Sequence, residues 1–275
     1  PLLSNQPVWN GKVAADLTTE EADAYATAQR RDIMTNVGVV FDLSERAEQE
    51  TYALLDLDGD GTAEKLLLRS RMAQAVNEVD QYIFAVNTMQ GETRTAQNLG
   101  NSIYAFTPDG RQILLALMRR DEFGQCESFL FRYENGELQE VGSFAQDIRE
   151  IWVENGQIIT NQLYDYTLQK ENLRIVYRIG SDGRLSEIPA DRYDLPEQSA
   201  LHGLNKDLEV CRTPDAGSER FTINADHGVY FPYLDAGRQW LCVETENGVT
   251  GWLKLADYTA EEAWAAFNDL IPNGG

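Results

Sequence analysis

The sequence predicts a mainly β protein with a minor helical part. We expect a helix, then an antiparallel β-meander built as an incomplete propeller or a sandwich, then a small β-barrel with a terminal helix. Two observations lead to this fold class. Asn-Gly and Asp-Gly dipeptides separate short apolar runs through the middle of the chain, and they supply the positive backbone angles that tight hairpins need. The two clearest helix-start signals lie near the two ends of the chain.

The length of 275 residues and a hydrophobic fraction of 43% allow more than one packed core. We predict a first domain over residues 1–190, which holds the first helix and the meander. Residues 191–205, with Pro196 and Gly203, are expected to form a linker. A C-terminal module should follow over residues 206–275.

The first helix is predicted from a capping box. Thr18 can cap the helix while Glu21 reaches back to the cap. The helix should run to about Met34, followed by a strand over residues 37–41 and a further helical turn over residues 44–49.

The sequence of residues 52–69 predicts two short apolar strands joined by an acidic loop. Carboxylates on every second residue let a curling loop direct its oxygens inward, and Gly61 permits the sharp turn. Calcium takes six to eight oxygen ligands in loose geometry. We therefore predict a calcium site whose ligands are Asp56, Asp58, Asp60, the main-chain carbonyl of Thr62, and Glu64. The alternative is a solvated acidic turn.

The loop is not an EF-hand, because Leu67 stands where an EF-hand carries its bidentate glutamate. Over residues 53–68 the sequence resembles the calcium loops of integrin-type and related bacterial surface repeats. It also resembles a segment of secreted or lipid-anchored proteins of Gram-positive bacteria. The resemblance implies a structural calcium ion and a place outside the cytoplasm.

Four hairpins are expected between residues 103 and 188. Their turns are residues 107–110, Asn135-Gly136, Asn155-Gly156 and residues 181–183. The flanking runs are rich in Val, Ile, Phe and Tyr, which suit a pleated surface. The sequence does not choose between propeller-like blades and a sandwich.

Residues 207–258 resemble the bacterial SH3-like barrel. The residues that match its strand pattern are Leu208, Val210, Pro214, Trp240, Val243, Gly251, Trp252 and Leu253. The chain departs from that pattern at Cys211, where arginine is usual. Domains of this family often bind cell walls, so the resemblance implies peptidoglycan or another cell-surface polymer or protein as partner. Trp240 and Trp252 are candidate ligand contacts, with a purely core role as the alternative. A capping box at Thr259 should then begin a helix to about Leu270, with Trp264 and Phe267 docked.

The net charge of −22, from 45 acidic and 23 basic residues, argues against nucleic acid and anionic membrane surfaces as partners. No apolar run approaches the roughly 20 residues that cross a bilayer, so we expect no direct membrane insertion. The chain starts at Pro1, which leaves a removed export signal or lipid anchor open. We expect an extracytoplasmic protein, secreted or at the cell surface.

The cysteines, Cys126, Cys211 and Cys242, form no C-x-x-C pair, so a zinc site is not expected. A disulfide between Cys211 and Cys242 stays open. The two histidines, His202 and His227, stand in turn-like sequence and are expected at the surface.

The sequence lacks G-x-S-x-G, H-E-x-x-H and a phosphate-cradling glycine loop. We therefore expect a non-enzymatic binding or scaffold protein. The main alternative is a glycosidase-like envelope hydrolase with an accessory wall-binding module, which needs two carboxylates at a suitable separation in a cleft. A third hypothesis is a partner-binding β protein whose acidic loop binds no metal.

Overall fold

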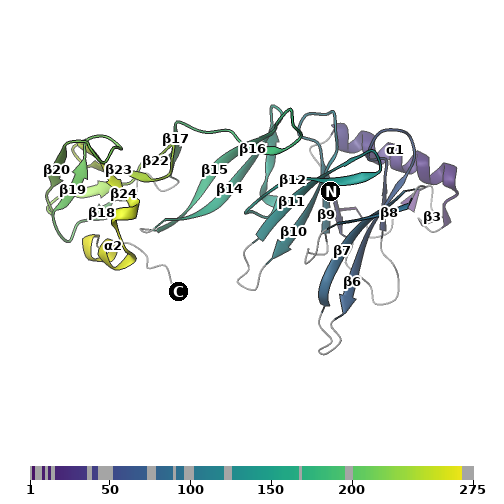
Figure 1. Ribbon diagram of the computed structural model, residues 1–275, viewed down its shortest axis with the longest axis horizontal. Helices are drawn as coiled ribbons and strands as arrows, with labels where there is room; N and C mark the ends of the chain where they lie inside the picture. Colours follow the sequence, from purple (N-terminus) through teal and green to yellow (C-terminus); the bar gives the residue numbers. More distant parts are fainter. Residues whose placement is uncertain are drawn as a thin grey trace. The chain divides into compact units, whose positions relative to one another are not determined.

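The computed structural model confirms the mainly β class, with nearly all strands in antiparallel sheets and a long helix near the N-terminus (Figure 1). The chain divides into two compact units: the first comprises residues 1–159 and 177–187, the second residues 160–176 and 188–275. The structure describes residues 2–3, 8–9, 12–13, 16–35, 39–42, 52–72, 79–88, 91–95, 102–120, 126–166, 169–195 and 201–267. The helical turn expected over residues 44–49 lies outside these ranges.

Helix α1 (Thr19–Thr35) begins at the capping box that the sequence predicts. The main-chain N–H of Thr18 donates to Glu21 Oε2 at 2.9 Å, and the N–H of Glu21 donates to Thr18 Oγ1 at 3.3 Å. The helix buries Tyr25, Ala26 and Ile33. The capping box explains where the helix begins, and the apolar face explains why the helix packs against the core.

Three four-stranded meanders follow one another along the chain. The first comprises β5 (Tyr52–Leu55), β6 (Glu64–Met72), β7 (Val79–Thr88) and β8 (Gly91–Thr95). The second comprises β9 (Ser102–Phe106), β10 (Leu114–Arg120), β11 (Cys126–Glu134) and β12 (Glu137–Phe144). The third comprises β13 (Trp152–Glu154), β14 (Gln157–Tyr166), β15 (Gln169–Ile179) and β16 (Leu185–Glu187).

Further strands are short. β4 (Val39–Asp42) extends the second sheet beyond β9, and β1 (Leu2–Leu3) pairs in parallel with β4. A separate two-stranded ribbon is made of β2 (Val8–Trp9) and β3 (Lys12–Val13).

The hairpin turns take the backbone angles that their sequences predict. Asn135 and Gly136 have φ of 54° and 81°, and Asn155 and Gly156 have φ of 52° and 77°. Two consecutive positive φ values define the type I′ turn that matches the twist of a hairpin. The turn residues therefore predict the strand pairing in this region.

The second sheet lies between the other two. Ile103, Leu115 and Phe131 on one face belong to a core with the first sheet and Ile33 of α1. Leu114 and Leu130 on the other face belong to a core with the third sheet. Both faces of β10 are therefore apolar. The sequence left open the choice between a sandwich and propeller-like blades. The described strands form three packed layers, one more than a two-sheet sandwich.

The second unit holds a sheet of short strands in the order β17-β22-β23-β24-β19-β20, with β21 pairing both β18 and β23. The strands are β17 (Arg192–Asp194), β18 (His202–Gly203), β19 (Leu208–Cys211), β20 (Arg220–Ile223), β21 (Gly228–Tyr230), β22 (Tyr233–Asp235), β23 (Trp240–Thr245) and β24 (Thr250–Lys254).

This sheet corrects the expectation of a barrel, because no ladder among the described strands joins β17 to β20. Pairing is sparse: β19 meets β24 only at Cys211 opposite Trp252, and β22 meets β23 only at Leu234 opposite Leu241. The linker expected over residues 191–205 contains β17 and β18, which pair with β22 and β21. β17 and β18 therefore belong to the C-terminal sheet, whereas Pro196 lies outside the described residues.

Helix α2 (Ala260–Ala266) begins at the predicted capping box, in which Glu262 Oε2 accepts from the N–H and hydroxyl of Thr259, each at 2.9 Å. Phe267 is buried and meets Phe231 edge-on at 5.2 Å, so the docking expected of Phe267 is confirmed. The helix ends at Ala266, earlier than the expected end at about Leu270, and Phe267 instead forms a β-bridge with Leu204. The side chain of Trp264 lies outside the described residues.

His202 is buried, which corrects the expectation of a surface residue. Its ring stacks on Phe231 at 4.5 Å, because β18 turns this side chain into the C-terminal core. Cys211 and Cys242 are free and lie opposite the same residue, Trp252, on either side of β24. Two strand spacings, about 9.5 Å, exceed the roughly 4.4–6.8 Å between the Cα atoms of a disulfide.

Candidate metal centre

The acidic loop (residues 56–63) joins β5 to β6. Leu55 pairs with Glu64 in the antiparallel register, so Asp56 and Glu64 stand at the base of the loop. Asp56 is 2% exposed and Glu64 3%, whereas Asp58 is exposed at the tip. Apolar residues in both strands hold this base against the core. Two carboxylates are therefore carried into the interior by the strands that flank them.

Carboxylate oxygens of Asp56, Asp58 and Glu64 lie within 4.8 Å of one another. Two oxygens bound to one calcium ion at about 2.4 Å can be at most about 4.8 Å apart. The spacing of this carboxylate triad (Asp56, Asp58, Glu64) therefore fits one shared cation. Three of the five predicted ligands come together in this way.

Asp60 stands outside the triad. Its Oδ1 accepts a hydrogen bond from the N–H of Thr62 at 2.7 Å, which shapes the loop instead. Asp58 Oδ1 likewise accepts from the N–H of Asp60 at 3.1 Å, and Asp56 Oδ1 from the N–H of Gly59 at 2.7 Å. The carbonyl of Thr62 as a metal ligand stays a prediction.

Burial makes the two inner carboxylates costly to ionise. It raises the pKa of Glu64 from 4.5 to about 7, although the N–H of Leu57 donates to Glu64 Oε2 at 2.6 Å and opposes the shift. Burial also raises the pKa of Asp56, against the opposing effects of the Gly59 N–H and Arg30. The neighbouring carboxylates raise both pKa values further. A cation at the triad would favour the ionised forms of all three groups.

Helix α1 supports the loop through two residues that the sequence analysis did not identify. Arg30 Nη1 donates to the carbonyl oxygens of Asp56 at 3.0 Å and Leu57 at 2.6 Å. Asp23 Oδ1 accepts from the N–H of Ala63 at 2.9 Å. Asp23 and Arg30 share a helix face with the buried Ala26 and Ile33, at intervals of three and four residues. That spacing was the signal for a polar contact beside the core.

A cavity of about 500 Å³ opens beside the acidic loop. Its walls carry three carboxylates, Asp58, Asp60 and Glu134, but Glu64 is not among the residues that line it. Glu64 turns its Oε2 to the Leu57 N–H inside the loop. Glu64, whose pKa burial raises to about 7, is therefore part of the triad and not of the cavity lining.

The two candidate tryptophans of the second unit line one smaller pocket of about 130 Å³. Trp240 is only 7% exposed, whereas Trp252 is half-buried and meets Tyr233 edge-on at 5.6 Å. Charged residues share the rim of this pocket: Glu209, Arg220, Lys254 and Asp257. Trp252 therefore offers ring surface to a ligand, while Trp240 mainly fills the core.

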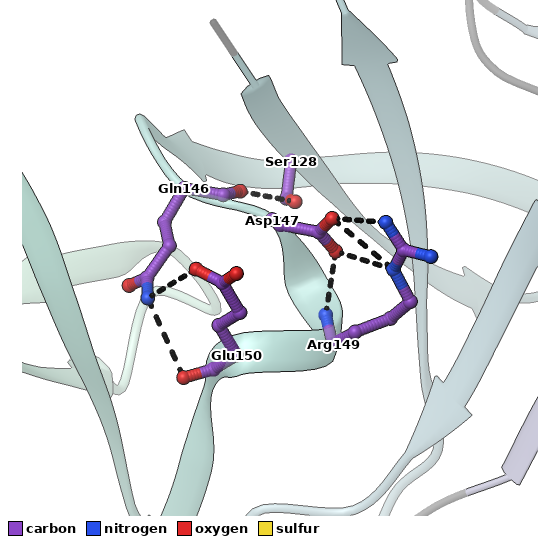
Figure 2. Close-up of polar contacts among 5 residues, drawn as sticks. All are labelled: Ser128, Gln146, Asp147, Arg149 and Glu150. Carbon is purple, nitrogen blue, oxygen red and sulfur yellow. Dashed lines mark hydrogen bonds and ion pairs between the residues drawn. The ribbon is translucent and has the colours of Figure 1, made fainter.

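A second polar cluster, after β12, has a structural role (Figure 2). Asp147 caps the short 3₁₀ helix Ile148–Glu150 by accepting from the N–H of Arg149 at 2.9 Å, and it forms an ion pair with the Arg149 guanidinium. The buried Ser128 donates to the carbonyl of Gln146 at 2.6 Å. These bonds hold the corner between β12 and β13, and they use the Asp147 carboxylate within the chain.

Comparison with known proteins assigns no family. No protein-family model matches the chain, and no curated protein matches it in sequence. Within the described ranges, no helix is both long enough and apolar enough to cross a membrane.

Proposed function

We propose that this chain is a non-enzymatic extracytoplasmic binding or scaffold protein with a structural calcium ion in its acidic loop. The convergence of Asp56, Asp58 and Glu64 within 4.8 Å, with two of the three buried, carries the proposal of a metal ion. Buried carboxylates without a compensating charge are strongly unfavourable. A bound cation removes this cost.

Calcium suits the triad better than magnesium. Calcium accepts carboxylates and carbonyls in irregular numbers, whereas magnesium demands a near-octahedral shell and keeps several waters. The ion would tie the ends of β5 and β6 together at the point where Arg30 and Asp23 hold the loop to α1. Extracellular calcium modules typically bind at about 10⁻⁴–10⁻³ M, which suits a structural role outside the cell.

The metal half of the proposal is tested by calorimetric titration with calcium. Wild type should release or absorb heat and melt at a higher temperature in millimolar calcium. Asp58→Asn should weaken binding at least about tenfold, since affinity follows the charge of the ligand set. Asp109→Asn is the matched control, because Asp109 makes the same kind of turn hydrogen bond in the next sheet at 3.0 Å. Absence of heat and of a melting shift in wild type would rule out the ion.

The binding half rests on the tryptophan-lined pocket of the second unit, offered to peptidoglycan or another cell-surface polymer or protein. Co-sedimentation with purified cell wall should fall in Trp252→Leu. Trp152→Leu serves as the control, since Trp152 is 37% exposed on β13 outside this pocket. If both variants sediment with cell wall as wild type does, Trp252 does not contribute to binding.

A further inference from the structure

The cavity beside the acidic loop has two chemically different sides. One side is the acidic loop, with Asp58 and Asp60. The other is the turn between β9 and β10, residues 107–113, which we call the arginine turn because Arg111 stands on it. The charged residues of its lining are Arg30, Asp58, Asp60, Arg111, Arg132 and Glu134.

The two loops share one hydrogen-bonding scheme. Thr107 Oγ1 accepts from the N–H of Gly110 at 2.8 Å, as Asp56 Oδ1 accepts from the N–H of Gly59 at 2.7 Å. Asp109 Oδ1 accepts from the N–H of Arg111 at 3.0 Å, as Asp58 Oδ1 accepts from the N–H of Asp60 at 3.1 Å. Arg111 therefore occupies the position that Asp60 occupies in the acidic loop, with the opposite charge.

The cavity is rich in arginine for a chain with 45 acidic and only 23 basic residues. Arg111 is exposed at the rim, and Arg30 is oriented by its two bonds to loop carbonyls. The Arg132 guanidinium already forms an ion pair with Glu134 at 3.0 Å. Guanidinium groups bind phosphate and carboxylate with two parallel hydrogen bonds. Arg30, on the acidic-loop side, and Arg111, on the arginine turn, each place such a group in the cavity wall.

Asp58 belongs both to the carboxylate triad and to the cavity wall. A cation held by Asp58 would therefore lie beside the cavity. Three carboxylates that each give one oxygen leave part of the six to eight oxygen positions of calcium open. Further oxygens then come from main chain, water or a ligand. An oxyanion in the cavity can supply one of them.

We propose that this cavity binds a small ligand bearing an oxyanion, held between the Arg111 guanidinium and the cation of the acidic loop. The inference rests on the proposed calcium site, since without the ion Asp58 and Asp60 would repel an anion. A volume of about 500 Å³ accommodates a metabolite-sized molecule. The polar walls select a charged ligand over an apolar one.

The test uses the full chain with methyl phosphate and acetate as separate probes, each with calcium and with a chelator. Binding is followed by calorimetry and by the NMR chemical shifts of the main-chain amides of Gly110 and Gln112. Methyl phosphate or acetate should bind in calcium, and the tighter probe identifies the oxyanion class. Arg111→Gln should weaken that binding at least about tenfold, because it removes a charged hydrogen-bond donor. Arg119→Gln, on β10 but outside the cavity lining, should leave it unchanged.

The outcomes separate this inference from the calcium site. If calorimetry detects calcium binding but neither probe binds, the proposed oxyanion site is overturned and the proposed calcium site stands. Absence of calcium heat overturns both. Probe binding that Arg111→Gln does not weaken, or that persists equally in chelator, also overturns the inference. Unchanged melting of Arg111→Gln confirms that the variant is folded, as expected for an exposed turn residue.

Discussion

The acidic loop and the arginine turn are built on the same backbone hydrogen bonds and differ in chemistry. In each, a side-chain oxygen accepts from the N–H three residues on, an aspartate accepts from the N–H two residues on, and the glycine between has a positive φ, 85° at Gly59 and 69° at Gly110. The arginine turn has this form with a threonine and an arginine in place of two aspartates. The bend itself therefore needs no metal. The burial of Asp56 and Glu64 sets the acidic loop apart.

The shared turn bonds shift the support for the proposed calcium site from the alternating aspartates to the buried carboxylates. The alternating aspartates drew attention to the loop, but Asp58 and Asp60 both serve as turn acceptors for main-chain N–H groups. Such local bonds are typical of aspartate in ordinary turns. Glu64 arrives from β6 and completes the triad. The closing acid, and not the alternation alone, distinguishes a metal loop from a turn.

The largest expected effect comes from removing the support that only the acidic loop has. Arg30→Met deletes two hydrogen bonds from a charged donor to loop carbonyls. The free energy of unfolding should fall by about 2–4 kcal/mol, and calcium affinity should fall with it. Denaturant unfolding measures the first and calorimetry the second. Arg31→Met, at the neighbouring exposed position, should change neither. Equal stability of both variants would mean that Arg30 does not hold the loop.

A smaller effect distinguishes the two glycines. Alanine at either position is strained by the positive φ, at about 1 kcal/mol or more. At Gly110 an added Cβ meets nothing within 4 Å, whereas at Gly59 it lies 3.0 Å from Cζ of Arg30. Gly59→Ala should therefore lose about twice the unfolding free energy that Gly110→Ala loses. A reversed order in denaturant unfolding would show that Arg30 moves away without cost.

The pH dependence of folding stability should also distinguish the acidic loop from the arginine turn. Glu64 has a pKa of about 7 in the folded protein against 4.5 ordinarily, so the folded state binds its proton more tightly than the unfolded state. In chelator, its contribution to stability is present below about pH 4 and is lost as pH rises through 7. Melting curves of wild type minus Glu64→Gln should show this decline. Calcium should reverse it, because the ion replaces the proton. A flat difference would place Glu64 in a solvated setting.

The smallest effect is expected at Asp60. Asparagine keeps the Oδ1 that accepts from the Thr62 N–H, and Asp60 stands outside the triad. Asp60→Asn should therefore change calcium affinity by less than about threefold, far less than Asp58→Asn. Calorimetry of the two variants side by side checks the order. Equal losses would show that Asp60 joins the ion's ligand shell when calcium binds.

Part of this protein was predictable from residues that are close together in the chain. The capping boxes at Thr18 and Thr259, the Asn-Gly hairpins and the strand–loop–strand form of residues 52–69 all depend on neighbours within a few positions. The candidate metal loop was found for the same reason. Local backbone angles and capping bonds are decided by those few residues, so a sequence displays them directly.

Contacts between residues far apart in the chain decided the rest. The stacking of three sheets, the support of the loop by Asp23 and Arg30, and the open C-terminal sheet depend on which surfaces meet in the folded chain. The separation of Cys211 from Cys242 by β24 has the same origin. A pattern of apolar residues reports that a face is buried. Which face it meets is settled only when all the strands compete for partners in three dimensions.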